Sequence, residues 1–252
     1  MENAVIIGRG TVGEATALAF SINKFFDIDA NKSNITLEEA HQCRYVFVCL
    51  PTPTIEKKCF TNDIFKIVSQ IRSYNKFENI FIIRSTVYPG FADYLMEGLG
   101  INSVVSNPEF LSEKTWQQDA IHPQLVVIGG RVRKYLDAVE GIYRARYSRI
   151  KPVLTNNTTA EIVKYAMNCW FSTKVVFSNE MFDIAQKLKG NYEVIKEVME
   201  LHPWGMKNHN TIWYNEQRGL HGKCLPKDLE AFADLTQSKF FKTLEELNAT
   251  YQ

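Results

Sequence analysis

The sequence has no hydrophobic run that approaches the ~18 residues of a membrane-spanning helix. It also lacks internal repeats, low-complexity segments and a long charged tail. Its 29 Lys and Arg nearly balance its 28 Asp and Glu, so neither nucleic acid nor a membrane is expected as a partner. The five cysteines are odd in number and irregularly spaced. They fit neither a disulfide framework nor a zinc site, so no metal is expected and the reducing cytoplasm is the expected compartment.

The composition that remains is that of an ordinary globular protein, with 45% hydrophobic and 23% charged residues. At 252 residues the chain is long enough for a large core and two domains. Short apolar runs alternate with helical patterns through residues 1–154, which predicts an α/β domain with a Rossmann-like, doubly wound parallel sheet. Residues 155–252 predict an all-α domain. Its centre is one long helix, because 159–189 contains neither Pro nor Gly and Gly190 follows.

A glycine motif follows the first apolar run. Gly8-Arg9-Gly10-Thr11-Val12-Gly13 lies between the predicted strand Ala4–Ile7 and a helical stretch, the context in which G-x-G-x-x-G binds dinucleotide phosphates. The alternative is a tight strand–helix turn without a ligand. Asp27 near the end of the second predicted strand favours the first interpretation, because an acid there accepts from both ribose hydroxyls and repels a 2′-phosphate. The pattern therefore indicates NAD rather than NADP.

Polar clusters follow the later predicted strands. Three of them are Pro51-Thr52, Ser85-Thr86 and the segment 107–113. In a parallel sheet, ligands bind outside the carboxyl ends of the strands. The side chains that we expect to line one site there are Thr52, Thr86, Glu109 and Glu113.

The long predicted helix carries a polar face. Glu161, Lys164 and Asn168 are spaced so that they share one side of it. Apolar neighbours favour a functional face over a solvated one, but the spacing alone leaves both open.

One cysteine has a distinctive setting. Cys224 follows Lys223 and precedes Lys227 and Asp228. Neighbouring cations favour the thiolate, which is the reactive form of cysteine, and a nearby carboxylate can move a proton. A surface turn with a spare cysteine is the alternative interpretation.

Together these motifs resemble those of the UDP-glucose/GDP-mannose dehydrogenase family. Eight occur in family order: Gly8-x-Gly10-x-x-Gly13, Asp27-Ile28-Asp29, Pro51-Thr52-Pro53, Ser85-Thr86-Val87, Asn107-Pro108-Glu109-Phe110-Leu111-x-Glu113, Ala160-Glu161-x-x-Lys164-Tyr165-Ala166-x-Asn168, Asn179-Glu180 and Gly219-x-x-Gly222-x-Cys224-x-Pro226-Lys227-Asp228. The resemblance implies an NAD-dependent 6-dehydrogenase that oxidises the C6 alcohol of a nucleotide sugar twice, to the carboxylate. A homodimer formed through the 159–189 helix is a separate hypothesis, because the apolar residues of that helix are too many for one narrow stripe.

The resemblance also implies roles for individual residues. Cys224 would form a thiohemiacetal and then a thioester, while Lys164 and Asn168 stabilise the oxyanion. Asp228, Glu109 and Thr86, with a water, would transfer protons. Cofactor contacts are implied for Gly8, Gly10, Thr11, Val12, Gly13, Asp27, Pro51, Thr52, Ser85, Thr86, Glu113 and Lys227. Substrate contacts are implied for Glu109, Phe110, Leu111, Glu113, Lys164, Asn168, Asn215, Arg218, Gly219, His221 and Gly222.

The chain departs from the family pattern in two respects. It resembles a compact form without the C-terminal domain that grips the nucleotide of the substrate. In the cysteine loop, Arg218 stands at an aromatic position and His221 at a glycine. His221 either narrows the sugar pocket or joins Arg218 in binding a phosphate. Two alternatives stay open: a single-step NAD-dependent dehydrogenase of a smaller hydroxy or sugar-phosphate substrate, and a non-catalytic NAD-binding subunit completed by another chain.

Overall fold

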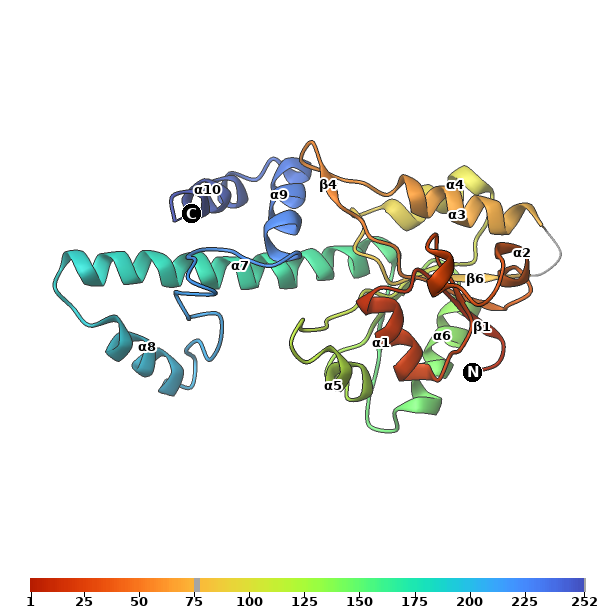
Figure 1. Ribbon diagram of the computed structural model, residues 1–252, viewed down its shortest axis with the longest axis horizontal. Coiled ribbons are helices and arrows are strands. Elements are labelled where there is room, and N and C mark those ends of the chain that lie inside the picture. The colour runs from red at the N-terminus through yellow and green to blue at the C-terminus, as the bar shows by residue number, and fades with distance from the viewer. Residues whose placement is uncertain (75–77, 252) are drawn as a thin grey trace. The chain divides into compact units, whose positions relative to one another are not determined.

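The computed structural model describes residues 1–74 and 78–251. The chain divides into two compact units (Figure 1). Unit 1 comprises residues 1–52 and 60–164, and unit 2 comprises residues 53–59 and 165–252. Gln252, which ends the predicted second domain, lies outside the described residues. The predicted domains 1–154 and 155–252 stay a prediction.

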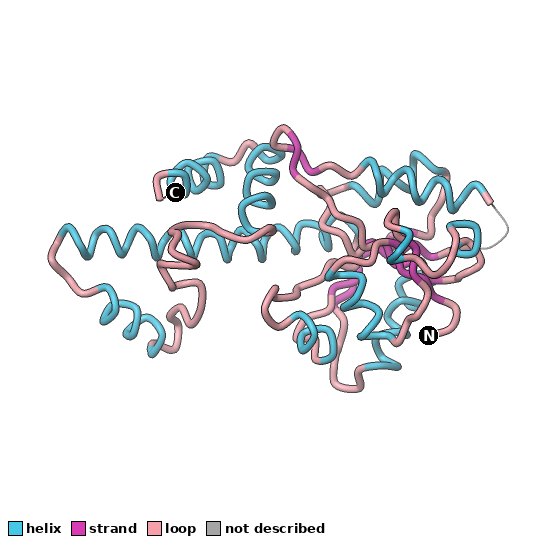
Figure 2. Tube along the Cα trace, viewed as in Figure 1, coloured by secondary structure: helices cyan, strands magenta, loops and turns pink. Residues whose placement is uncertain are grey.

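Unit 1 is built on one seven-stranded sheet, drawn in magenta in Figure 2. Its strands in spatial order are β2 (Phe25–Phe26), β1 (Ala4–Ile7), β3 (Tyr45–Val48), β6 (Ile80–Ile83), β7 (Val104–Ser106), β8 (Val127–Gly130) and β9 (Val153–Thr155). The first five are parallel to one another. The predicted Rossmann-like α/β class is confirmed.

Helices cover both faces of this sheet, because alternate strand side chains point to opposite sides. On one face, Val5 and Ile7 of β1 share a core with α3 (Asn62–Ser73) and α4 (Phe91–Leu99). On the other face, Ala4 and Ile6 share a core with α1 (Thr11–Phe20) and α6 (Arg133–Arg146). β1, β3 and β6 are buried on both sides, which explains why they appear as continuous apolar runs in the sequence. The smaller helices are η1 (Ala30–Lys32), α2 (Leu37–Ala40) and α5 (Trp116–Ile121).

The sheet reverses direction at β8, which departs from the expected parallel arrangement. β8 is antiparallel to β7, and β9 is parallel to β8. The cause lies in the connection: between β7 and β8 the chain forms only the six-residue α5, about 9 Å long. No long crossover helix returns the chain to the opposite edge before β8 begins, so β8 runs back beside β7. The 14-residue α6 then provides the crossover that makes β9 parallel to β8.

The predicted long helix is α7 (Asn157–Lys187), and it begins two residues before the predicted start. Its first turn is capped by Asn156, whose Oδ1 accepts from the Thr159 N–H at 2.8 Å. Gly129 of β8 lets this turn approach the sheet, because a Cβ there would lie 2.6 Å from the Asn156 carbonyl oxygen and 2.7 Å from Ala160 Cβ. At its other end, the chain reverses through Lys189 at φ 58° and the Gly190 N–H donates to the Ala185 carbonyl at 2.7 Å.

Unit 2 combines most of α7 with α8 (Tyr192–Leu201), α9 (Leu225–Thr236) and α10 (Lys239–Ala249). A hairpin of β4 (Thr54–Ile55) and β5 (Lys58–Cys59) belongs to the same unit and packs against α9. Its core joins Cys169 and Val176 of α7 to Leu229 of α9 and Leu244 of α10. Among the described residues, no helix is both long and apolar enough to cross a membrane.

Candidate active site

The glycine loop between β1 and α1 is compressed in the way a dinucleotide-binding turn requires. Gly8 has φ +93°, and a Cβ there would lie 2.7 Å from the Cys49 carbonyl oxygen. A Cβ on Gly13 would lie 2.1 Å from the Gly8 carbonyl oxygen, so only glycine lets α1 pack so closely on the strand. By contrast, a Cβ on Gly10 would meet nothing within 4 Å. Gly10 is the N-cap of α1, so open space lies at the end of the helix where backbone N–H groups favour an anion.

Asp27 lies beside this loop. Its Oδ2 accepts from the Arg9 N–H at 2.7 Å and its Oδ1 from the Asp29 N–H at 3.0 Å. Burial raises the pKa of Asp27, but these backbone hydrogen bonds and the nearby Lys32 outweigh burial and bring the pKa below its ordinary value. A fixed negative charge therefore stands at the end of β2, where the sequence predicts the ribose-binding acid. The loop and this acid together fit an NAD molecule whose pyrophosphate lies at the start of α1.

The structure brings together the predicted polar residues that follow β3 and β6. Thr52 Oγ1 donates to the Thr86 carbonyl at 2.6 Å, and Ser85 Oγ donates to the Leu50 carbonyl at 2.7 Å. Thr52 and Ser85 are buried, whereas Pro51 is exposed. The two strand ends are thus tied side by side at the carboxyl edge of the sheet.

Glu109 and Lys164 form a buried ion pair. Lys164 Nζ donates to Glu109 Oε1 and to the Glu109 carbonyl, both at 2.8 Å. The two side chains are only 7% and 11% exposed. Burial raises the pKa of Glu109, but the Lys164 ammonium and hydrogen bonds from Lys164 and the Leu111 N–H outweigh burial and hold the pKa below its usual range. The pair places a cation and a carboxylate together just beyond β7.

A small pocket in unit 1 adjoins this pair. Residues at the ends of β6 and β7 and on the first turns of α7 line it: Ile83, Ser85, Thr86, Val87, Ser106, Pro108, Glu161 and Lys164. Glu161 enters from the same face of α7 as Lys164, and sequence reasoning assigned it no role beyond that face.

The other predicted residues of the 107–113 segment differ in position: Phe110 and Leu111 lie at the Glu109–Lys164 pair, and Glu113 does not. Phe110 lies near Lys164, with Nζ 5.7 Å from the ring centroid. The Leu111 N–H donates to Glu109 Oε2 at 2.6 Å and so orients that carboxylate. Glu113 is exposed in the turn before α5 and makes no hydrogen bond or ion pair with the other described residues. The structure therefore supports part of the predicted cluster and leaves Glu113 apart from it.

A buried polar cluster behind Glu109 escaped sequence reasoning. Arg84 Nη1 donates to Asn107 Oδ1 at 2.9 Å and to Tyr143 Oη at 2.9 Å. Tyr143 Oη in turn donates to Asn107 Oδ1 at 2.6 Å, and Asn107 Nδ2 donates to the Val127 carbonyl at 2.7 Å. These bonds fix the residue two positions before Glu109. No sequence signal marks Tyr143 for this role, because it lies in the helical pattern of α6.

In unit 2, Cys224 is the N-cap of α9 and is exposed. The Asp228 N–H donates to the Cys224 carbonyl at 3.0 Å, which is the first hydrogen bond of the helix. The sequence predicts a helix only from Leu229; Pro226 in the first turn favours the earlier start that the structure shows. Cys224 therefore lies at the end of α9 toward which the backbone N–H groups of the first turn point.

Asp228 is held one turn further along α9. It is 1% exposed, and its Oδ2 accepts from Asn168 Nδ2 at 2.6 Å. Its Oδ1 accepts from Lys227 Nζ. The β4–β5 hairpin, which sequence reasoning missed, fixes the lysine from outside, because Thr54 Oγ1 donates to the Lys227 carbonyl at 2.9 Å. The structure thus brings together three residues that were predicted separately for the site: Asn168, Lys227 and Asp228.

The loop before Cys224 is anchored to α7. Arg218 Nη2 lies 2.9 Å from Asp183 Oδ1, and its Nε donates to Asn179 Oδ1 at 3.1 Å. Its guanidinium also faces the ring of Tyr251, 5.2 Å away. Arg218 is thus engaged within unit 2, in place of the phosphate that one sequence-based alternative assigns to it.

The other predicted loop residues differ in exposure. Asn215 and Gly222 are exposed, and both have positive φ. Gly219 has φ +82°, and a Cβ there would lie 2.7 Å from Asn248 Oδ1. His221 stacks near Tyr214, with ring centroids 6.2 Å apart, and its buried Nε2 has no hydrogen-bond partner among the described residues. Among the described residues, no group of three or more His, Cys, Asp or Glu side chains is arranged to hold a metal ion.

Two profiles of the UDP-glucose/GDP-mannose dehydrogenase family match the chain. The NAD binding domain matches residues 29–146, and the central domain matches residues 158–250. The first match begins after the glycine loop, so the fit of residues 8–13 to NAD rests on their geometry.

Individual relatives agree with these profiles. The chain is 28% identical over 221 residues to UDP-glucose 6-dehydrogenase of Rickettsia felis, covering 84% of this chain and 48% of that protein. It is 31% identical to the Rickettsia conorii protein of the same name, covering 82% of this chain and 48% of that protein. The chain thus spans about half the length of the curated relatives it matches. A UDP-glucose dehydrogenase structure from the archaeon Pyrobaculum islandicum shares the fold, with a TM-score of 0.86, 22% identity and coverage of 99% of this chain and 68% of that chain.

Proposed function

Because the chain belongs to the UDP-glucose/GDP-mannose dehydrogenase family, we propose that it provides the NAD-binding and catalytic parts of a nucleotide-sugar 6-dehydrogenase. The reaction is the two-step oxidation of a sugar C6 alcohol to a carboxylate. The observation that carries the proposal is the position of Cys224 at the N-terminus of α9, one turn from the buried Asp228 that Asn168 holds. That setting favours a thiolate with a carboxylate close by in the sequence and in the helix.

NAD accepts one hydride in each of the two oxidations. The residues that would hold it are Gly8, Gly10 and Gly13 at the pyrophosphate and Asp27 at the ribose. The compressed loop, the open space at Gly10 and the charge on Asp27 support this assignment. The further cofactor contacts expected from the sequence are Thr11, Val12, Pro51, Thr52, Ser85, Thr86, Glu113 and Lys227. Of these, Glu113 receives the least support, since it lies exposed before α5.

The covalent step belongs to Cys224. The first oxidation leaves an aldehyde at C6, and the Cys224 thiolate adds to that carbon. A C–S bond forms and the carbonyl oxygen takes up a proton, which gives a thiohemiacetal. Loss of a hydride from C6 and of the hydroxyl proton gives a thioester. Water then adds to the thioester carbon and the C–S bond breaks, which releases the carboxylate and regenerates the thiolate.

Negative charge develops on the C6 oxygen during the reaction, and hydrogen-bond donors are needed to stabilise it. Lys164 and Asn168 are four residues apart on α7, so the helix places a cation and a neutral amide on one face. We assign to both the stabilisation of the oxyanion. Their present partners, Glu109 and Asp228, are carboxylates that would accept protons from the substrate hydroxyl and from the attacking water. Thr86, at the pocket beside Lys164, would orient that water.

The substrate class is a nucleotide sugar. The residues assigned to it are those expected from the sequence: Glu109, Phe110, Leu111, Glu113, Lys164, Asn168, Asn215, Arg218, Gly219, His221 and Gly222. Within this set His221 is the residue most suited to select the sugar, because its buried Nε2 has no hydrogen-bond partner in the part of the chain that the structure describes. Arg218 is assigned to shape the loop, since Asn179 and Asp183 already hold its guanidinium.

The partner that we propose is a second copy of the chain, bound through α7. Trp170, Phe177 and Ile184 recur every seven residues along this helix and are 56%, 49% and 42% exposed. Large apolar side chains with this spacing form a seam that another helix can cover. Sedimentation of the wild type as a monomer at micromolar concentration contradicts this part of the proposal. Replacement of Phe177 by Glu is expected to weaken association without a change at Cys224.

The proposal is tested by NADH formation in a panel of sugars. UDP-glucose, GDP-mannose, their N-acetyl analogues and the bare sugar phosphates are each incubated with NAD and the 252-residue protein. We expect NADH with a nucleotide sugar, and no acid product from Cys224→Ser. Cys59→Ser is the matched control, since it removes a different thiol. Activity only on a bare sugar phosphate, with one NADH per substrate, supports the single-step alternative. NAD binding without turnover on any of these compounds rejects the proposal.

A further inference from the structure

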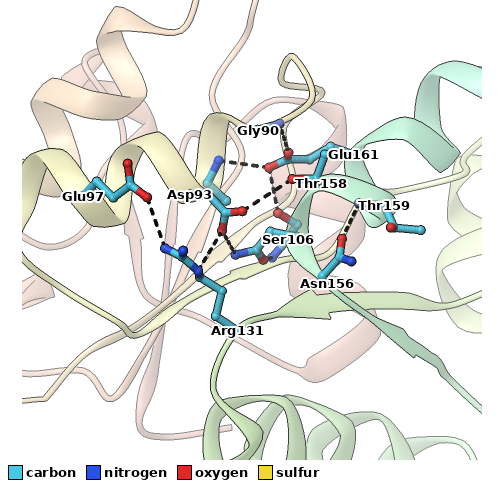
Figure 3. A network of polar contacts seen from close by, with 11 residues as sticks. Gly90, Asp93, Glu97, Ser106, Arg131, Asn156, Thr158, Thr159 and Glu161 are labelled. Atoms are coloured by element: carbon cyan, nitrogen blue, oxygen red, sulfur yellow. Dashed lines mark hydrogen bonds and ion pairs between the residues drawn. The ribbon is translucent and has the colours of Figure 1, made fainter.

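Glu161 is a buried carboxylate without a basic partner. It is 3% exposed, and among the described residues no Lys, Arg or His lies within ion-pair distance of it. Three donors face its carboxylate instead (Figure 3). Gly90 N–H donates to Oε2 at 2.6 Å, and Ala92 N–H donates to Oε1 at 3.0 Å. Ser106 Oγ donates to Oε1 at 2.9 Å. The charge is thus held by hydrogen bonds and by the N-terminus of α4.

These contacts join three elements of unit 1. Gly90 is the N-cap of α4, Ser106 ends β7, and Glu161 lies in the second turn of α7. Lys164 follows three residues later on the same face, where it reaches Glu109 just beyond β7. Glu161 and Lys164 line the same pocket. Residues three apart are neighbours on one helix face. The hydrogen bonds that hold Glu161 therefore also limit where the Lys164 ammonium can meet Glu109.

The charges around Glu161 oppose its ionisation. Asp93 of α4 accepts from Asn157 Nδ2 at 3.1 Å and from Thr158 Oγ1 at 3.4 Å. Arg131, which follows β8, lies 3.9 Å from Asp93 and 3.4 Å from Glu97. Lys164, the nearest cation of α7, is occupied by Glu109. Figure 3 shows Arg131 directed to the two acids of α4 while Glu161 faces Gly90 and Ser106.

The balance of these effects places the titration of Glu161 close to neutrality. Burial raises the pKa of Glu161 most, and Asp93 raises it further. The hydrogen bonds from Ala92, Gly90 and Ser106 lower it, and the resulting pKa is about 7. A small change in pH near neutrality therefore changes the number of hydrogen bonds that this carboxyl group accepts.

We propose that Glu161 is a positioning residue for Lys164, and that its protonation loosens the first turns of α7 from α4 and β7 and so weakens the Lys164–Glu109 pair. The ionised carboxylate accepts from all three donors. The neutral acid carries a proton on one oxygen, which makes that oxygen a weak acceptor. A proton on Oε2 weakens the hydrogen bond from Gly90, which is the bond that links α7 to the N-cap of α4.

The hydrogen bonds to the Glu161 carboxylate can be followed by NMR, without a measurement of enzyme activity. An amide proton that donates to a carboxylate changes its chemical shift when the carboxylate ionises. We expect the Gly90 and Ala92 amide signals of the 15N-labelled protein to titrate together, with a midpoint near 7. Glu161→Gln should abolish this titration. The 13Cε signal of Lys164, identified through Lys164→Met, should follow the same midpoint.

Two variants move the midpoint in opposite directions and leave Glu161 in place. Ser106→Ala removes a donor to the ionised form and is expected to raise the midpoint by about 0.5–1 pH unit. Asp93→Asn removes a neighbouring negative charge and is expected to lower the midpoint. Because the two shifts are opposite in sign, a general loosening of the fold does not imitate them.

The second readout rests on the proposed dehydrogenase function. The acidic limb of the pH profile of NADH formation is expected to shift to higher pH in Ser106→Ala and to lower pH in Asp93→Asn, in parallel with the midpoints of the amide signals. An unchanged limb, or a Lys164 signal that does not follow Glu161, overturns the positioning role and leaves the dehydrogenase function standing. If no sugar yields NADH, the proposed function fails, and the Gly90, Ala92 and Lys164 signals still decide the role of Glu161. If the Gly90 and Ala92 amide signals do not titrate between about pH 5.5 and 8.5, the positioning role of Glu161 is also overturned.

Discussion

Removal of the Lys164 ammonium is the perturbation with the clearest expected signature. In Lys164→Met the carboxylate of Glu109 stays buried at 11% side-chain exposure, and its ion-pair partner is gone. Breaking a buried pair in this way costs about 3–5 kcal/mol, since an uncompensated charge is left behind. For a chain of this size, that corresponds to a fall in melting temperature of about 6–20 °C.

The loss is expected to depend on pH, with a sign that follows from Glu109. In the wild type its folded-state pKa is lowered, so the pair stabilises the fold above the unfolded-state pKa of about 4.3, and that stability is lost as pH falls through the folded-state pKa. In Lys164→Met, burial without Lys164 raises the pKa of Glu109. The free energy of unfolding of the variant therefore falls as pH rises above about 4.3, because the buried carboxyl group resists ionisation. The difference from wild type is therefore larger at pH 8 than at pH 4.

Scanning calorimetry at several pH values measures this difference. Lys174→Met is the matched control, because Lys174 is a buried lysine whose Nζ donates to the neutral Asn208. Because burial and the Lys174 ammonium lower the pKa of His209, both chains are compared in a His209→Gln background. There the removal of Lys174 leaves no buried carboxylate and no titrating imidazole, so its effect is expected to be the same at pH 5 and pH 8. The double variant Glu109→Gln/Lys164→Met should recover part of the loss. Equal, pH-independent destabilisation by Lys164→Met and by the double variant would refute the reasoning.

Four further outcomes are expected. Gly13→Ala should lower both stability and NAD affinity, because its Cβ would lie 2.1 Å from a carbonyl oxygen. Gly10→Ala, where a Cβ meets nothing, should fold normally and lose only NAD affinity in calorimetric titration. Asp27→Ala should narrow the preference for NAD over NADP, measured as the ratio of the two dissociation constants; an unchanged ratio places the ribose elsewhere. Arg218→Met should make the loop before Cys224 more sensitive to limited proteolysis, since the contacts with Asn179 and Asp183 are lost.

Much of unit 1 follows from local patterns. The run Ala4–Ile7 and the glycines after it predict the first strand and its turn, because the burial and the close packing leave few alternatives. The helical patterns over 62–73 and 91–99 predict two helices, and α3 and α4 occupy these same ranges. The reversal at β8 escaped prediction, since the direction of a strand depends on where the preceding chain lies and not on the strand's own residues.

The candidate site was predictable where its chemistry is carried by residue types. Cys224, Asp228, Lys164 and Glu109 attract notice because thiols, carboxylates and ammonium groups are reactive. The residues that hold them attract less notice. Tyr143 reaches Asn107 from a helix that is distant in the sequence. Such contacts arise from tertiary packing, and no local spacing records them.

Helix boundaries near the cysteine show the same limit. The apolar pattern of α9 becomes visible only at Leu229, whereas the helix begins at Leu225. The first turn consists of Leu225, Pro226, Lys227 and Asp228, and the Asp228 N–H closes it by donating to the Cys224 carbonyl. The functional consequence, a thiol at a helix N-terminus, is therefore absent from the hydrophobic pattern.

The central claim is that Cys224 carries the sugar as a thioester between two oxidations. The most direct test quenches the protein during turnover with its best nucleotide sugar and NAD, and then combines peptide mass spectrometry with a count of NADH per acid formed. The account predicts an acyl adduct on the peptide that contains Cys224, two NADH per acid, and neither adduct nor acid in Cys224→Ala. One NADH per product, or full activity in Cys224→Ala, would contradict it.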